Sequence, residues 1–136
     1  MSQAGIVIVV MLSIVGALVS GCSIRVQESD LYGEYVAEYQ NGMQKLTLEK
    51  GGRYVQEVTL KESNKPMINS GAWKYHRPSN EVDLENCLGV GDGFGKIRPD
   101  FATNRGGCTY PVERRWLIWG RLRLGPDEAS PLWKVK

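Results

Sequence analysis

The chain has 136 residues, of which 17 are basic and 15 acidic, giving a net charge of +2. A charge this small argues against a nucleic-acid-binding protein, which would present a strongly basic face. Every charged residue lies after Gly21, so residues 22–136 carry the whole charge, and their number fits one domain with a modest core.

Residues 4–19 are apolar or small throughout. This run is long enough for the core of a signal peptide but shorter than the roughly 18 residues of a membrane-spanning helix. A cleaved signal is therefore favoured over the two alternatives, an uncleaved membrane anchor and a buried strand. Residues 1–5 carry no Lys or Arg, whereas signal peptides ordinarily begin with positive charge, a departure that a start further upstream would explain.

Cys22 is preceded directly by Leu18, Val19, Ser20 and Gly21. This arrangement resembles the lipobox of bacterial lipoproteins, in which signal peptidase II needs a small residue before the cysteine and an apolar one two places earlier. The resemblance implies that residues 1–21 are a signal peptide, that Cys22 is the lipidated first residue of the mature protein, and that residues 22–30 form a tether. In lipoproteins of this kind, a residue resembling aspartate directly after the lipidated cysteine retains the protein in the inner membrane. Ser23 occupies that position here, so the resemblance implies the periplasmic face of the outer membrane.

Cys87 and Cys108 remain as a pair if Cys22 carries lipid. Because the cell envelope permits disulfides, we expect the two to be bridged, with two free buried thiols as the alternative. Closing a loop of about 20 residues would stabilise the fold by about 3 kcal/mol. Two cysteines with the single histidine, His76, lack the close ligand spacing of zinc sites, so we expect no metal and no other cofactor.

The first part of the domain alternates apolar and polar residues with the period of two that β-strands show. Turn signals separate these runs at Asn41-Gly42, at Gly51-Gly52 and at residues 78–80. We predict strands at residues 31–39, 43–50, 53–60, 71–77 and 81–85.

Residues 86–111 lose this alternation and are rich in glycine, which predicts a long loop. Order returns in residues 112–124, which we predict to be one strand with a bulge or bend at Gly120, and a last strand follows at residues 132–135. We expect an aromatic core formed by Tyr54, Trp73, Tyr75 and Trp116.

Successive short strands must hide their edges, and closure into a barrel does so. We therefore predict an all-β domain over residues 31–136, a small antiparallel meander of about seven strands that forms a closed or half-open barrel. Paired positions recur as Gly33-x-Tyr35, Leu46-x-Leu48, Gly52-x-Tyr54, Gly71-x-Trp73 and Val82-x-Leu84. This pattern resembles the lipocalin-like barrels of bacterial lipoproteins, including the copper-stress and adhesion-sensing family. The chain lacks the Cys-x-x-Cys of that family, so the resemblance does not imply metal handling.

The catalytic patterns are weak. His76 is predicted to face solvent from a strand, and Asp83 and Glu85 share a strand face, as any residues two apart on a strand do. The glycine-rich run 89–96 lacks the first glycine and the Ser or Thr of a phosphate-binding loop. We predict a non-enzymatic protein, with a hydrolase of envelope polymers using His76 with Asp83 or Glu85 as the alternative. A depression gathering these side chains would favour hydrolysis, and an apolar interior with all three outside it would favour binding.

Basic residues concentrate between residues 96 and 123, a stretch that contains seven basic and two acidic residues. A solvated strand face is one interpretation, and a recognition surface is the other. The predicted binding residues are Phe94, Lys96, Arg98, Arg105, Arg114 and Arg115. We expect the disulfide to hold the loop beside the strand that contains Arg114 and Arg115, in a lipid-anchored binding or interaction module whose partner is an envelope protein, an anionic lipid or a glycan.

Overall fold

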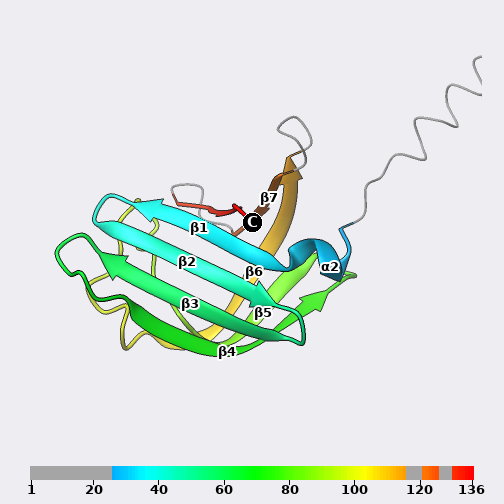
Figure 1. The fold of residues 1–136 in the computed structure, drawn as a ribbon, viewed down its shortest axis with the longest axis horizontal. Helices are drawn as coiled ribbons and strands as arrows, with labels where there is room; N and C mark the ends of the chain where they lie inside the picture. Colours follow the sequence, from blue (N-terminus) through cyan, green and yellow to red (C-terminus); the bar gives the residue numbers. More distant parts are fainter. Residues whose placement is uncertain (1–25, 116–120, 126–129) are drawn as a thin grey trace, which may run out of the picture.

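The computed structural model describes residues 26–115, 121–125 and 130–136. Within these ranges eight strands form one closed antiparallel barrel, in which each strand pairs with the next and β8 returns to β1 (Figure 1). The strands are β1 (Gly33–Tyr39), β2 (Gly42–Glu49), β3 (Arg53–Leu60), β4 (Met67–His76), β5 (Glu81–Leu88), β6 (Arg105–Arg115), β7 (Arg121–Leu124) and β8 (Leu132–Lys134). One short helix, α2 (Glu28–Leu31), precedes β1. The predicted all-β barrel is confirmed, with eight strands instead of about seven.

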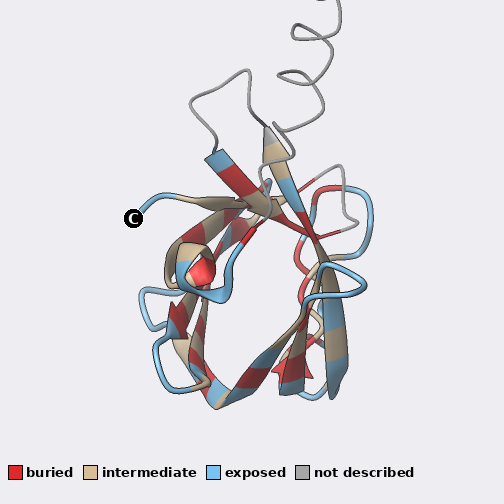
Figure 2. Ribbon diagram, turned by 90° about the vertical axis from the view of Figure 1, so that its right-hand side faces the viewer, coloured by how far each residue is buried: buried red, intermediate tan, exposed pale blue. Residues whose placement is uncertain are grey.

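Alternating side chains fill the barrel interior, as the bands of buried residues along the strands show (Figure 2). Tyr35, Tyr54 and Leu84 are at most 1% exposed. Trp73 is also buried, and its indole nitrogen donates to the main-chain carbonyl of Glu49 at 2.9 Å. The predicted aromatic core is confirmed for Tyr54 and Trp73, and Tyr75 packs against it partly buried. Trp116, the fourth aromatic residue predicted for the core, lies outside the described residues.

The first hairpin turn lies one residue earlier than its sequence signal. Tyr39 pairs with Gly42, so the turn residues are Gln40 and Asn41, and Gly42 already belongs to β2. A Cβ atom at Gly42 would lie 2.5 Å from the side chain of Ile97 and 2.4 Å from a main-chain oxygen of β3. The glycine is therefore needed for close packing at this position, where the β5–β6 connection meets the sheet.

The single strand predicted for residues 112–124 is wrong. Val112 pairs with Leu124 and Arg115 pairs with Arg121, so this stretch forms the two antiparallel strands β6 and β7. Gly120, where we predicted a bulge within one strand, lies between them and outside the described residues. The prediction failed because the apolar residues Val112, Trp116, Ile118, Leu122 and Leu124 keep one strand register in the sequence, and no Pro, Asn or Asp interrupts residues 112–124.

The loop predicted for residues 86–111 is shorter in the structure, where it spans residues 89–104. A register shift between Leu84 and Cys87 marks a β-bulge in β5, and Asn86 there has a φ of 52°. The bulge exposes two successive residues and then buries two, which breaks the period of two although the strand continues to Leu88.

Buried polar side chains satisfy the main chain at this bulge. The Gln56 amide donates to the Leu88 carbonyl at 3.0 Å and accepts from the Leu88 amide at 2.9 Å. Asn69 donates to the Asn86 carbonyl at 2.9 Å, and the Tyr54 hydroxyl donates to the carbonyl of Glu85 at 2.6 Å. These bonds use interior side chains to replace ladder bonds that the bulge breaks.

Different segments close the two ends of the barrel. At the end where β1 begins, Leu31 of α2 is fully buried, Val26 is 8% exposed, and the Leu31 carbonyl accepts from the Tyr35 hydroxyl at 2.8 Å. The folded body thus includes the last residues of the predicted tether, from Val26 onward. The opposite end is covered by residues 89–104. Among the described residues, no helix is long and apolar enough to cross a bilayer.

Candidate functional site

Residues 89–104, which we call the capping loop, are anchored on the end of the barrel opposite α2 (Figure 1). The side chains of Val90, Ile97 and Phe101 are at most 8% exposed. The Asn41 side chain in the β1–β2 turn accepts from the Ile97 amide at 2.7 Å and donates to the Ile97 carbonyl at 3.2 Å. The sequence indicated a glycine-rich loop, and in the structure these three side chains complete the core at this end.

The tip of the capping loop is a compact turn built around one carboxylate. Asp92 Oδ1 accepts from the amides of Phe94 at 2.7 Å and Lys96 at 3.1 Å, and the Asp92 amide donates to the Lys96 carbonyl at 3.0 Å. These amides, with Phe94 first, hold the pKa of Asp92 below its usual value. Gly93 and Gly95 have φ values of 85° and 87°, which L side chains rarely adopt.

Phe94 stands at this tip with 83% of its surface exposed, more than any other large apolar side chain in the described ranges. The chain on either side is held: Asp92 bonds the tip internally, and the Gln40 amide donates to the Gly95 carbonyl at 2.9 Å. The fold therefore holds an exposed aromatic ring on an ordered main chain. The sequence indicated Phe94 and Lys96 as binding residues but gave no role to Gln40, Asn41 or Asp92.

The disulfide between Cys87 and Cys108 is present, with 6.0 Å between the two Cα atoms, so the free-thiol alternative is wrong. It joins β5 to β6 beside the bulge, where the ladder lacks regular pairs. The predicted bridge thus ties the base of the capping loop. No group of three or more His, Cys, Asp or Glu side chains suited to a metal occurs among the described residues.

The predicted cationic residues do not form one surface. Lys96 and Arg98 lie in the capping loop, and Arg98 pairs with Asp100 at 3.0 Å. Arg105 donates to the Asn69 side chain at 2.8 Å and so supports the interior network. Arg114 pairs with Asp30 of α2 at 3.3 Å, at the other end of the barrel.

The expectation that the disulfide holds Lys96, Arg98 and Arg105 beside Arg114 and Arg115 is therefore wrong. Arg105 and Arg115 are the first and last residues of β6, and an extended strand of that length separates its ends by about 30 Å. The side chain of Arg115 lies outside the described part of the structure.

The outer face of β4, β5 and β6 holds the residues of the hydrolase alternative. His76, Asp83 and Glu85 line a depression of about 660 Å³ there. His76 Nε2 lies 2.6 Å from Asp83 Oδ2, and the Thr109 hydroxyl donates to Asp83 Oδ1 at 2.8 Å. A depression therefore gathers the three side chains, which was the criterion for hydrolysis. All three lie outside the barrel interior, as the criterion for binding requires, but that interior is not wholly apolar because it also buries Gln44, Gln56 and Asn69.

The order of these groups is unfavourable for nucleophilic catalysis. In a serine-hydrolase triad the imidazole lies between the hydroxyl and the carboxylate, so that it can take the proton of the hydroxyl. Here the Asp83 carboxylate lies between, and it bonds the His76 ring through one oxygen and the Thr109 hydroxyl through the other. The hydroxyl is therefore hydrogen-bonded to a weak base and not to the imidazole.

No protein-family model, curated protein or solved structure matches this chain significantly.

Proposed function

We propose that this protein is a lipid-anchored, non-enzymatic binding module of the cell envelope, tethered through Cys22 and contacting its partner through Phe94. The observation that carries the proposal is the 83% exposure of Phe94 on a tip whose main chain is bonded to Asp92 and to the β1–β2 turn. Exposed apolar rings are costly in water, and aromatic side chains are common energetic centres of protein interfaces.

The anchored main chain also favours binding. A partner that accepts Phe94 has to immobilise the ring but not the loop, because Asp92 and Gln40 already restrain the backbone. Such preorganisation lowers the entropy cost of association. Lys96 and Asp92 flank the ring, so the fitting partner is an envelope protein with an apolar pocket and a polar rim.

The tether places this loop away from the membrane. Val26 follows Cys22 by four residues and packs at the α2 end, whereas the capping loop covers the other end. The seven residues of β1 alone separate these ends by about 20 Å. A lipid on Cys22 would therefore leave Phe94 accessible to partners in the periplasm.

Two features favour binding over hydrolysis of envelope polymers. The hydroxyl of Thr109 is bonded to Asp83 and not to His76, and Asp83 is already engaged by both groups. Two of the buried polar side chains, the amides of Gln56 and Asn69, bond to each other and to the strand backbone. Their hydrogen-bonding capacity therefore stabilises the fold.

A site-specific crosslinking experiment in cells tests the proposal. Phe94 is replaced by the photoreactive residue benzoylphenylalanine in one strain, and Ile68, which is 62% exposed on the outside of β4, is replaced in a matched control strain. Irradiation should give a discrete protein adduct from position 94 and none of the same mass from position 68. Equal adducts from both positions, or none from position 94, would overturn the role of Phe94.

The anchor is tested separately in the same cells. Labelling with a fatty-acid analogue should mark the wild-type chain and should be lost in Cys22→Ala. Labelling that persists in Cys22→Ala would refute the lipid anchor. His76→Ala should leave the turnover of envelope polymers unchanged, and a loss of turnover in that variant would support the hydrolase alternative instead.

A further inference from the structure

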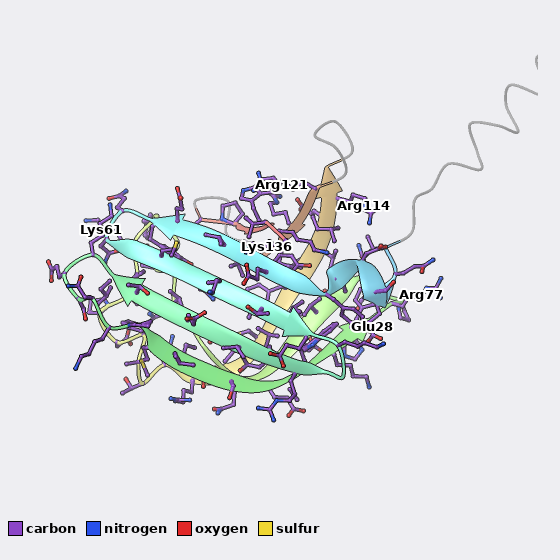
Figure 3. All side chains as sticks on the ribbon, in the orientation of Figure 1. Glu28, Lys61, Arg77, Arg114, Arg121 and Lys136 are labelled. Carbon is purple, nitrogen blue, oxygen red and sulfur yellow. A yellow bond between two sulfur atoms is a disulfide. The ribbon has the colours of Figure 1, made fainter. Side chains whose placement is uncertain are left out.

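A second polar depression, of about 430 Å³, lies beside α2 and is lined by four basic side chains, which we call the tether-end cluster: Arg114, Arg121, Lys134 and Lys136. Among the residues that the structure describes, Asp30 is the one acidic side chain in the same lining. The cluster combines residues from β6, β7, β8 and the C-terminal residues, and Figure 3 shows Arg114 and Arg121 close together on the side of the molecule where α2 lies. Lys61 is at the opposite end (Figure 3).

Barrel closure brings these cations together. Arg114 pairs in register with Leu122, and Lys134 pairs with Tyr35, so both are at inward-facing positions where their strands reach the mouth of the barrel. Arg121 donates through Nε to the Lys134 carbonyl at 3.0 Å. Its guanidinium also lies over the Trp133 ring, 5.4 Å from the centroid, which fixes its direction.

The carboxylates nearby leave positive charge in excess. Asp30 pairs with Arg114 at 3.3 Å and its carbonyl accepts from Lys134, and Glu34 reaches Lys136 at 3.7 Å. Lys136 is 80% exposed in that contact, so the pair is screened by water. Burial lowers the pKa of Lys134 most strongly, the Asp30 carboxylate opposes this effect, and the positive charge of Arg114 adds a smaller lowering.

One further group in the cluster lacks a partner. The Arg114 Nε atom is buried and makes no hydrogen bond within the described part of the chain. A buried donor of this kind is costly unless an acceptor reaches it. Because this Nε atom is buried, a phosphate would meet the accessible guanidinium and ammonium groups of the cluster instead, which bind phosphate oxygens through charge-assisted hydrogen bonds.

The cluster lies where the tether begins. The Tyr75 hydroxyl donates to the Val26 carbonyl at 3.3 Å, which holds Val26 at the α2 end. The four residues from Cys22 to Val26 span at most about 14 Å when fully extended. A lipidated Cys22 would therefore keep this end of the barrel within reach of the lipid headgroups, and tethering makes even weak contacts effective by raising the local concentration.

We propose that the tether-end cluster binds the phosphate headgroups of anionic lipids in the membrane that holds the protein, and so orients the barrel with its capping loop facing away. This inference rests on the lipid anchor of the proposed function but not on the role of Phe94. The membrane surface is favoured over a free glycan because the site adjoins the tether.

The test uses the mature lipoprotein purified from cells that make the full chain. It is incorporated into vesicles of phosphatidylcholine, either pure or with about a third phosphatidylglycerol. A donor dye is attached at Ser79→Cys, in the β4–β5 turn at the α2 end, or at Ser63→Cys at the capping-loop end, and the acceptor dye is on a lipid headgroup. Energy transfer to position 79 should be higher in the anionic vesicles, and position 63 should stay distant in both.

The variant R121Q/K136Q should lower the ratio of docked to undocked protein by about 30-fold, since each basic residue near an anionic surface contributes about 1 kcal/mol. The control K61Q/K65Q removes the same charge from exposed lysines at the other end and should change nothing. Raising the salt from about 0.1 to 0.5 M should weaken docking in the wild type.

Each failure has a distinct meaning. Protein that does not float with pure phosphatidylcholine vesicles lacks the lipid anchor, which refutes the proposed tether. Protein that floats with both vesicle types but shows equal energy transfer in them refutes membrane docking alone. Equal loss in the control variant would also overturn the site.

Discussion

Replacing Asn69 by leucine should destabilise the barrel more than its single buried amide suggests. Asn69 is 6% exposed and donates to the Asn86 carbonyl at 2.9 Å, to Gln56 Oε1 at 3.2 Å and to the Tyr54 hydroxyl at 3.3 Å. It also accepts from Arg105 at 2.8 Å. Leucine has a similar volume, so the change removes the bonds without leaving a large cavity.

The expected cost follows from what each partner retains. Gln56 keeps its bonds to Leu88, and Tyr54 keeps its bond to the Glu85 carbonyl, so neither is left unsatisfied. The Asn86 carbonyl loses its amide partner, which costs about 1–3 kcal/mol for a buried acceptor. With the lost charged bond from Arg105, we expect the free energy of unfolding to fall by about 2–3 kcal/mol.

Urea unfolding of the mature protein, with the disulfide kept intact, measures this change. The urea concentration at the midpoint of unfolding should fall, and the dependence of the free energy of unfolding on urea should stay the same. At about 4 °C per kcal/mol for a domain of this size, the melting temperature should fall by roughly 10 °C. Ser70→Ala is the matched control, because Ser70 is the exposed neighbour on the same strand and its substitution should cost less than about 0.5 kcal/mol. A change below about 0.5 kcal/mol for Asn69→Leu would refute the idea that this network supports the bulge.

Three further changes test other parts of the structure. Replacing both disulfide cysteines by alanine should lower the free energy of unfolding by about 3 kcal/mol, measured by urea titration, and an unchanged midpoint would argue that the bridge adds nothing to stability. Gly71→Ala should cost about 1–3 kcal/mol, because the added Cβ would lie 2.7 Å from a main-chain oxygen of β5 and 2.9 Å from the Tyr54 ring, and a melting temperature equal to wild type would contradict this packing. The amides of Phe94 and Lys96 lower the pKa of Asp92 in the folded protein. The ionised carboxylate therefore stabilises the loop tip at pH values above the unfolded pKa of about 4. This stabilisation is lost as the pH falls through the folded pKa. Hydrogen-exchange protection of the Phe94 amide should then decrease on acidification below about pH 4 and be low at every pH in Asp92→Ala; protection independent of pH in the wild type would count against the turn.

The local pattern of the sequence was sufficient to predict that the first five strands exist and which faces they bury. Their bounds were less accurate, because residue 31 lies in α2 and not in the predicted strand 31–39, and β4 begins at Met67, four residues before the predicted strand 71–77. Tyr35, Leu46, Tyr54 and Val82 each lie on the inward face that alternation predicted. The physical reason is that side chains of a strand alternate strictly between two faces, so a run with one apolar face reports its own orientation. The pairing of Cys87 with Cys108 was similarly predictable once one of three cysteines was assigned to the lipobox.

Features that depend on a partner strand were not predictable in this way. The β-bulge near Asn86 reverses the alternation within β5, and the β6–β7 hairpin reverses the chain where the sequence still alternates. In both cases the structure depends on which residues face each other across the ladder, and that pairing involves positions far apart in the chain.

The tip of the capping loop and the tether-end cluster also show which features the sequence predicted and which required the tertiary structure. Composition alone pointed to Phe94 and to an excess of basic residues after residue 96, but not to their arrangement. Tertiary structure decided that Asn41 anchors the capping loop 56 residues away and that Asp30 meets Lys134 104 residues away. Because the barrel closes β8 onto β1, the cationic cluster of β6, β7 and β8 lies beside α2 and the start of the tether, while the capping loop is held at the opposite end. The distance between the cluster and the capping loop follows from the length of the strands and from the closure of the barrel. Barrel closure depends on pairing between distant strands, which no local sequence pattern specifies.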